Sequence, residues 1–447
     1  MSIQDDAPAA DSLRTAAERA RIVALDKRHV WHPYTPMGDY VAHVEPLVIH
    51  HARGSRLYDA DGRSFIDGNA SWWTALLGHG HPRLAQALRR QTELLCHTSL
   101  AGVTHQSAAE LAERLVAVAP PGLTRVFYSD DGSTAVEIAI KLALQYFHQN
   151  GRPRRTRFVA LDGAFHGETL GVTALGGVDV FRRPFAGALM DCIHVPVGHD
   201  GYERAFDALA RIVQHESDTI AAVVLEPIVQ GVAGMRMYDS DYLRAAREVT
   251  AAQDIFLVLD EVFTGYGRTG PMWASQHADV SPDILCTAKG FTGGTLPMAA
   301  TLTTERVFEG FLGDRARAFY YGHTFCGNPL GAVVARAVLD VYRDENILER
   351  ARPKAARIAE AFERMRSIEG VDGTRSLGMI GALTLSGSEG YLQQSGWAVY
   401  REALKRGAYV RPLGNVVYVT PPLNIDDATL DELLCIVAAS VRAAMQG

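Results

Sequence analysis

Short apolar runs alternate with stretches of helical periodicity through the middle of the chain. The apolar runs predict strands at 125–129, 157–161, 191–196, 220–226, 255–260, 283–288 and 298–303. Helical periodicity falls between several of them, at 133–148, 202–216 and 240–252. Because strands that are buried on both faces are apolar along their whole length, this alternation predicts an α/β fold with a mostly parallel sheet covered by helices.

The pattern differs on either side of this region. Before it, residues 59–62 (Asp-Ala-Asp-Gly) predict the turn of a hairpin, and Ser107 with Glu110 predicts a capping box that opens a helix. From about residue 331 the chain becomes mainly helical, with a short sheet expected near 378–385 and 416–420. The change predicts a smaller second domain.

Composition narrows the class of protein. The 447 residues include 44 Lys and Arg against 51 Asp and Glu, which gives a formal net charge of -7. The chain lacks the excess of basic residues that would indicate nucleic-acid binding. No apolar run has the roughly 18–20 residues of a membrane-spanning helix. The acidic start of the chain differs from a basic signal peptide, so a cytoplasmic enzyme with small-molecule substrates is expected. The five cysteines lack a Cys-x-x-Cys spacing, which argues against a disulfide framework and a structural zinc site.

Three predicted strands end in residues that carry chemistry. The strand at 125–129 leads into Asp131-Gly132-Ser133-Thr134 and a helix, an arrangement that presents N–H groups to an anion, although Ser133 or Thr134 could equally be an ordinary N-cap. The strand at 255–260 ends in Asp260, which could hold a ligand cation, cap a helix or form an ion pair. The next strand ends beside Lys289 and a glycine-rich loop.

Lysine is rare in this chain, so Lys289 stands out. The other four, Lys27, Lys141, Lys354 and Lys405, lie in helical stretches where solvated side chains are expected. A lysine beside an apolar strand has a lowered pKa and becomes a nucleophile towards aldehydes. An anion site, a strand-end carboxylate and such a lysine together meet the needs of pyridoxal phosphate.

Several motifs give the chain a recognisable family. Those typical of the general class are Phe165-His166-Gly167-Glu168-Thr169, Asp260-Glu261-Val262, Gly265-Tyr266-Gly267-Arg268-Thr269-Gly270 and Ala288-Lys289-Gly290. With them the chain resembles the class III (fold type I) pyridoxal-phosphate-dependent aminotransferases along nearly its whole length. The resemblance implies a large domain at 71–335 with a mostly parallel central sheet, and a smaller α+β domain built from both termini, 1–70 and 336–447.

A second set of motifs resembles the branch of this family that acts on 8-amino-7-oxononanoate in biotin biosynthesis. These are Trp31-His32-Pro33-Tyr34, Ser71-Trp72-Trp73, Glu226-Pro227-Ile228-Val229-Gln230-Gly231, Thr324-Phe325, Gly327-Asn328-Pro329 and Arg411-Pro412-Leu413-Gly414. The implied reaction is a ping-pong transamination that gives 7,8-diaminononanoate. The amino donor is left open between S-adenosylmethionine and lysine, and the alternative is a class III transaminase for an ω-amino acid or diamine.

The resemblance also implies roles for individual residues. Lys289 would bind the cofactor aldehyde and Asp260 would pair with the ring nitrogen. Gly132 and Ser133 would bind the phosphate, with Phe165 against the ring. In a homodimer with shared active sites, Thr324 would reach the phosphate of the neighbouring subunit. The residues implied for substrate binding are Tyr34, Trp72, Trp73, Arg268 and Arg411, the last for the keto-acid carboxylate. Phe165, Glu168 and His323 stand where the family branch usually has tyrosine, aspartate and proline.

Three further motifs allow other interpretations. The glycines at 265–270 match a dinucleotide fingerprint, which leaves an NAD-dependent dehydrogenase as a remote alternative. Ser386-Gly387-Ser388-Glu389 imitates a phosphate loop, but no helix is expected after it, so a surface loop is favoured. His79 and His81 could suggest a metal, but without a third ligand at a suitable spacing a turn is favoured and no metal is expected.

Overall fold

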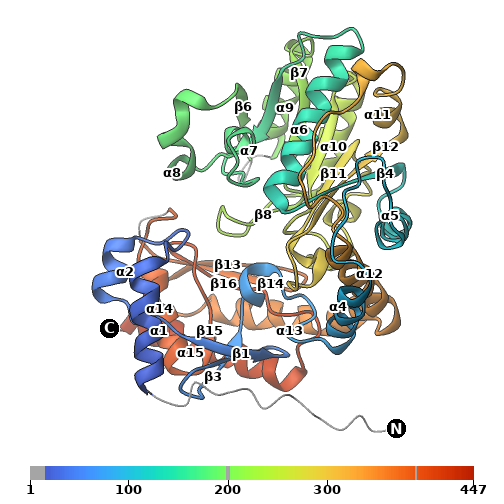
Figure 1. The fold of residues 1–447 in the computed structure, drawn as a ribbon. Helices are drawn as coiled ribbons and strands as arrows, with labels where there is room; N and C mark the ends of the chain where they lie inside the picture. Colours follow the sequence, from blue (N-terminus) through green and yellow to red (C-terminus); the bar gives the residue numbers. More distant parts are fainter. Residues whose placement is uncertain (1–15, 198–201, 388–389, 447) are drawn as a thin grey trace.

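The computed structural model describes residues 16–197, 202–387 and 390–446, and its largest sheet has seven strands, which lie in the upper half of Figure 1. The strand order is β4-β12-β11-β10-β7-β5-β6, and β12 runs antiparallel to both of its neighbours while the other pairs are parallel. The strands are β4 (Leu123–Ser129), β5 (Arg157–Leu161), β6 (Cys192–Val195), β7 (Ile220–Leu225), β10 (Phe256–Asp260), β11 (Ile284–Thr287) and β12 (Ala299–Thr304). The mostly parallel sheet and its strands are therefore confirmed.

Helices cover both faces of this sheet, as its apolar strands require. On one face α6 packs against alternate strand residues such as Phe158, Val224 and Phe256. On the other face α9 and α10 pack against the intervening residues, such as Val159 and Leu257. The helices of this region are α5 (Gln106–Val118), α6 (Gly132–Gln149), α7 (Leu170–Leu175), α8 (Asp179–Arg182), α9 (Tyr202–His215), α10 (Ser240–Ala252) and α11 (Glu305–Glu309), and β8 (Val229–Gln230) pairs with β9 (Arg236–Met237).

The remaining elements come from the N-terminal and C-terminal parts of the chain and lie together in the lower half of Figure 1. β15 pairs in parallel with β3 in the sheet β1-β2-β3-β15, and β13-β14-β16 forms an antiparallel sheet. The strands are β1 (Ile49–Arg53), β2 (Arg56–Asp59), β3 (Ser64–Asp67), β13 (Val371–Leu377), β14 (Ile380–Leu385), β15 (Ala408–Tyr409) and β16 (Val416–Val419). The helices are α1 (Ala16–His29), α2 (Met37–His43), α3 (Ala70–Trp73), α4 (Pro82–Leu94), α12 (Pro329–Asp344), α13 (Ile347–Met365), α14 (Ser395–Lys405) and α15 (Asp427–Gln446).

These elements confirm the hairpin at 59–62 and the sheet near 378–385 and 416–420. The domain boundaries after residues 70 and 335 stay a prediction. Among the described residues, no helix combines the length and the apolar character needed to cross a bilayer. Residues 388–389 of the predicted surface loop lie outside the described residues.

Two local predictions are wrong. The predicted cap Ser107 lies inside the first turn of α5, because the helix begins at Gln106 and its N-cap is His105, which accepts the N–H of Ala108 at 3.2 Å. Lys354 is buried rather than solvated, and its ammonium donates to the carbonyl oxygen of Leu423 at 2.9 Å. Its burial follows from the packing of α13 against other elements, which the helical pattern alone does not report.

Candidate functional site

A cavity of about 480 Å³ lies at the carboxyl ends of the parallel strands. Neighbouring strands β7, β10 and β11 lead into Glu226, Asp260 and Lys289, so the parallel register brings these three residues to one edge of the sheet. The predicted site residues that line the cavity are Tyr34, Trp73, Gly132, Ser133, Phe165, Asp260 and Lys289. The structure thus brings together residues that lie far apart in the sequence.

Lys289 presents an amine in an apolar setting. It follows β11 and has φ 47°, and its Nζ lies 5.0 Å from the centre of the Trp73 ring. Burial lowers the pKa of Lys289, against the opposing effects of Asp260 and Glu226. A lysine with a lowered pKa supplies more of the neutral amine that attacks a carbonyl carbon.

Asp260 is buried and shares a hydrogen bond with a histidine. One of its carboxylate oxygens lies 2.8 Å from Nδ1 of His166, and the other accepts the N–H of Val262 at 3.0 Å. Burial disfavours a charged imidazole, but the hydrogen bond and the charge of Asp260 outweigh burial and raise the pKa of His166. Nε2 of His166 is buried and has no partner among the described residues. The pair thus places a buried carboxylate and an imidazole side by side in the cavity wall.

Glu226 is a site residue whose function the sequence did not reveal. Its carboxylate accepts the N–H of Phe165 at 3.0 Å and the N–H of Gly231 at 2.9 Å. Burial, together with the charge of Asp260, raises the pKa of Glu226 to about 7. Its position in the sequence could have revealed it, because Glu226 directly follows the apolar strand β7, much as Asp260 ends β10. By holding the backbone of Phe165, Glu226 places that aromatic ring in the cavity wall.

The start of α6 forms an anion-binding turn. Asp131, and neither Ser133 nor Thr134, is the N-cap, and it forms a capping box with Thr134. The cap satisfies the N–H of Thr134, and this leaves the N–H groups of Gly132 and Ser133 without an intrahelical acceptor. Glycine is required at 132 because a Cβ there would lie 2.7 Å from Cγ1 of Val262. The helix start therefore offers two N–H groups and the positive end of the helix dipole to an anion.

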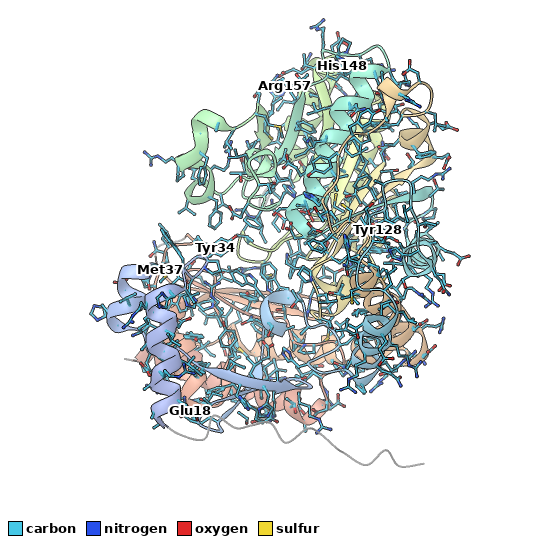
Figure 2. All side chains as sticks on the ribbon, viewed as in Figure 1. Glu18, Tyr34, Met37, Tyr128, His148 and Arg157 are labelled. Carbon is cyan, nitrogen blue, oxygen red and sulfur yellow. The ribbon has the colours of Figure 1, made fainter. Side chains whose placement is uncertain are left out.

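A second group of side chains lies towards solvent. Tyr34 donates a hydrogen bond to Glu168 at 2.8 Å and packs edge-on against Trp72 at 5.4 Å. The guanidinium of Arg411 lies 4.9 Å from the centre of the Trp72 ring. Figure 2 shows Tyr34 where the N-terminal segment meets the part of the chain that holds the seven-stranded sheet. Trp72 and Arg411 thus lie beside the cavity, because Tyr34 lines the cavity and also packs against Trp72.

The two tryptophans come from an unusual backbone. Ala70, Ser71, Trp72 and Trp73 all have positive φ, between 44° and 73°. The N–H of Trp73 donates to the carbonyl oxygen of Asn69 at 2.8 Å, and that of Thr74 to Ala70 at 2.9 Å, so the segment is one turn of left-handed helix. Each non-glycine residue in this conformation costs roughly 1–2 kcal/mol, so surrounding contacts must hold the turn.

Four predicted residues do not line the cavity: Trp72 and Arg411 lie beside it, whereas Arg268 and Thr324 do not. Arg268 is fully buried and donates to the carbonyl oxygens of Pro421 at 2.9 Å and Met379 at 3.4 Å. Thr324 is exposed, on a segment that does not line the cavity of this single chain. Neither position places these side chains against a ligand within one subunit.

The motif at 78–81 forms a turn. His79 lies 2.9 Å from Asp67, and His81 lies 3.3 Å from Glu345. Each histidine therefore has its own carboxylate partner. Within the described ranges, no group of three or more His, Cys, Asp or Glu side chains is arranged to hold a metal ion.

Comparison with known proteins shows which family the chain resembles in sequence and fold. A sequence family described as "Aminotransferase class-III" matches residues 39–441. The adenosylmethionine-8-amino-7-oxononanoate aminotransferase of Nitratidesulfovibrio vulgaris is 41% identical over 450 residues, which cover 96% of this chain and 83% of that protein. The crystal structure of the enzyme of that name from Methanocaldococcus jannaschii has a TM-score of 0.92 at 32% identity and covers 95% of this chain and 99% of that one. An omega transaminase of Pseudomonas jessenii, in complex with PMP, has a TM-score of 0.90 at 26% identity, with 95% and 98% covered.

Proposed function

The chain belongs to the class III aminotransferases, whose cofactor is pyridoxal phosphate, and we propose that it transfers an amino group to 8-amino-7-oxononanoate. The product is 7,8-diaminononanoate, a precursor of biotin, and the proposed donor is S-adenosylmethionine. Relatives named for this reaction match nearly the whole chain, at 41% and 38% identity for two of them. The structural observation that carries the proposal is the guanidinium of Arg411 over Trp72, beside the cavity that contains Lys289.

The residues present fit the cofactor. The cavity offers an amine of lowered pKa on Lys289, a buried carboxylate on Asp260 and two N–H groups at the start of α6. Gly132 lets the start of the helix pack closely against Val262, because a side chain there would clash with Val262. When bound, pyridoxal phosphate supplies an electron sink for cleavage of the C–H bond at the amine-bearing carbon.

The side chains would then divide the work of the reaction. Nζ of Lys289 would hold the aldehyde carbon of the cofactor until the substrate amine displaces it, and the freed amine would then move a proton from one carbon to the other. Asp260 would keep the ring nitrogen protonated, and its partner His166 keeps the carboxylate oriented. The N–H groups of Gly132 and Ser133 would hold the phosphate, and Phe165 would supply an aromatic surface for the ring.

The aromatic side chains and Arg411 suit a long keto acid. Trp73 in the cavity wall and the exposed Trp72 and Tyr34 offer apolar surface to a methylene chain, and Arg411 can bind a carboxylate bidentately. A carboxylate remote from the reacting ketone needs such a cation at a distance from the lysine. The exposed position of Thr324 supports a homodimer in which this residue reaches the cofactor phosphate of the neighbouring subunit. The proposed location of the enzyme is the cytoplasm.

The second candidate is an omega-amino-acid or diamine transaminase, which the likeness to the Pseudomonas jessenii enzyme favours. Single-turnover experiments separate the two. The pyridoxal form is mixed with S-adenosylmethionine, lysine or an ω-amino acid, and the pyridoxamine form with 8-amino-7-oxononanoate. We expect S-adenosylmethionine to convert the pyridoxal form rapidly to the pyridoxamine form, and 8-amino-7-oxononanoate to convert it rapidly back. Rapid turnover of ω-amino acids without reaction of 8-amino-7-oxononanoate would assign the chain to the second candidate.

A further inference from the structure

The left-handed turn at 70–73 carries two tryptophans, and a cluster behind it explains how the turn is held. Asp67 ends β3, and its side chain is fully buried. One of its oxygens, Oδ2, accepts the hydroxyl of Ser71 at 2.7 Å and the Nε2–H of His79 at 2.9 Å. A buried carboxylate needs such partners, so the three side chains stabilise one another.

His79 is itself fixed by the backbone. Its N–H donates to the carbonyl oxygen of Gly54 at 2.7 Å, and its carbonyl accepts the N–H of Gly54 at 2.9 Å. The preceding Gly78 has φ 69°, and a Cβ there would lie 2.8 Å from the Gly54 carbonyl oxygen. The β1–β2 hairpin therefore fixes His79, which holds Asp67, which in turn holds Ser71.

The two tryptophans of the turn lie in different parts of the site, Trp73 near Lys289 and Trp72 near Arg411. Trp73 packs 4.5 Å from Phe263, donates its indole N–H to Tyr418 at 3.1 Å and lies under the Lys289 ammonium. Trp72 lies between Tyr34 and the guanidinium of Arg411.

Asn69, directly before the turn, connects it to Arg411. Its side-chain oxygen accepts the backbone N–H of Arg411 at 2.6 Å. The conformation of the turn therefore sets the aromatic wall and the nearby cation together.

We propose that Asp67 and His79 are positioning residues that hold Ser71, and with it the left-handed turn, so that Trp72 and Trp73 are in place before substrate binds. Neither residue lines the cavity, so both act through the turn. The statement about substrate rests on the proposed function, whereas the statement about the turn rests only on the contacts above. Because the two tryptophan side chains are already ordered in the free enzyme, less free energy is lost in ordering them when the substrate binds.

The first test compares two neighbouring histidines in the holoenzyme. His79→Ala removes the donor to Asp67, and His81→Ala is the matched control because its imidazole contacts Glu345 and not the turn. We expect His79→Ala to raise the KM for 8-amino-7-oxononanoate about 10- to 100-fold, as loss of a charge-assisted hydrogen bond implies, with kcat changed much less. His79→Gln retains an N–H donor near the same position and should recover most of the loss. His81→Ala should leave KM near the wild-type value, even if its melting temperature falls. Equal KM values for His79→Ala and His81→Ala would overturn the proposal.

The second test uses the turn itself. Ser71→Ala removes the hydroxyl and keeps a Cβ in the left-handed region, whereas Ser71→Gly removes the hydroxyl but adopts positive φ without strain. The near-UV circular dichroism of the tryptophans should change in Ser71→Ala and stay closer to wild type in Ser71→Gly, and the opposite order would refute the role of the cluster. This readout needs no substrate. If the wild-type enzyme does not react with the keto acid, the proposed function fails while the dichroism still decides the positioning role.

Discussion

Replacing Gly132 by alanine tests the anion-binding turn through one added methyl group. The new Cβ would lie 2.7 Å from Cγ1 of Val262, closer than real Cβ atoms approach their neighbours, and 3.1 Å from Cγ2, which is a tight contact. Val262 is β-branched and follows Asp260, so it has little freedom to rotate away. The start of α6 must therefore move, and its two N–H groups move with it.

The size of the effect follows from packing and hydrogen bonding. Forcing an extra methyl group into a filled space costs typically 1–3 kcal/mol, and moving the two N–H groups away relieves this strain at the expense of phosphate binding. Since 1.4 kcal/mol is a tenfold change in an equilibrium constant, we expect pyridoxal phosphate to bind roughly 5- to 150-fold more weakly. The assay is titration of the apoenzyme with the cofactor, followed by absorbance of the bound form.

A second substitution shows whether the clash is the cause. In the double variant Gly132→Ala with Val262→Ala, the nearest remaining Val262 atom is the Cβ at 3.5 Å, an ordinary contact, so most of the affinity should return. Gly187→Ala is the matched control, because a Cβ there meets nothing within 4 Å. Unchanged affinity in Gly132→Ala, or no recovery in the double variant, would refute the placement of the phosphate at this turn.

Four further predictions test the remaining parts of the site. Lys289→Ala should abolish turnover while pyridoxal phosphate still binds non-covalently; borohydride labelling of the wild-type chain at any other lysine would contradict this. Asp260→Asn should keep the fold but lower the single-turnover rate by about 100-fold or more, because the ring nitrogen loses its charged partner, and an unchanged rate would make Asp260 structural. Arg411→Ala should weaken the keto-acid half-reaction by about one to two decades, the value of a bidentate charge-assisted hydrogen bond, and equal slowing of both half-reactions with a lower Tm would refute its role in substrate binding. If Thr324 completes the neighbouring site, dilution to monomers should release the cofactor, and a fully active monomer would exclude the shared site.

Some features of the site could be predicted from local sequence. Asp260 and Lys289 stand out because each ends an apolar run, and in a parallel sheet such ends meet at one edge. Capping was harder to predict, because His105 caps α5 where Ser107 has the more typical side chain. Lys354 has a polar sequence context, yet the packing of α13 buries it.

The succession of strands and helices along the chain, and the polar residues at the strand ends, could be predicted from the amino-acid sequence. They depend on short apolar runs and on helical periodicity of 3.6 residues, which are local properties of the chain. The position of Trp72 and Tyr34 beside Arg411 could not be predicted in this way, because that contact depends on the pairing of β15 with β3, which are far apart in the sequence. The tertiary structure also decided the left-handed turn at 70–73, since positive φ in four successive non-glycine residues opposes every local preference. Contacts from distant residues such as His79 supply the free energy that holds it, and no pattern within the turn itself reports them.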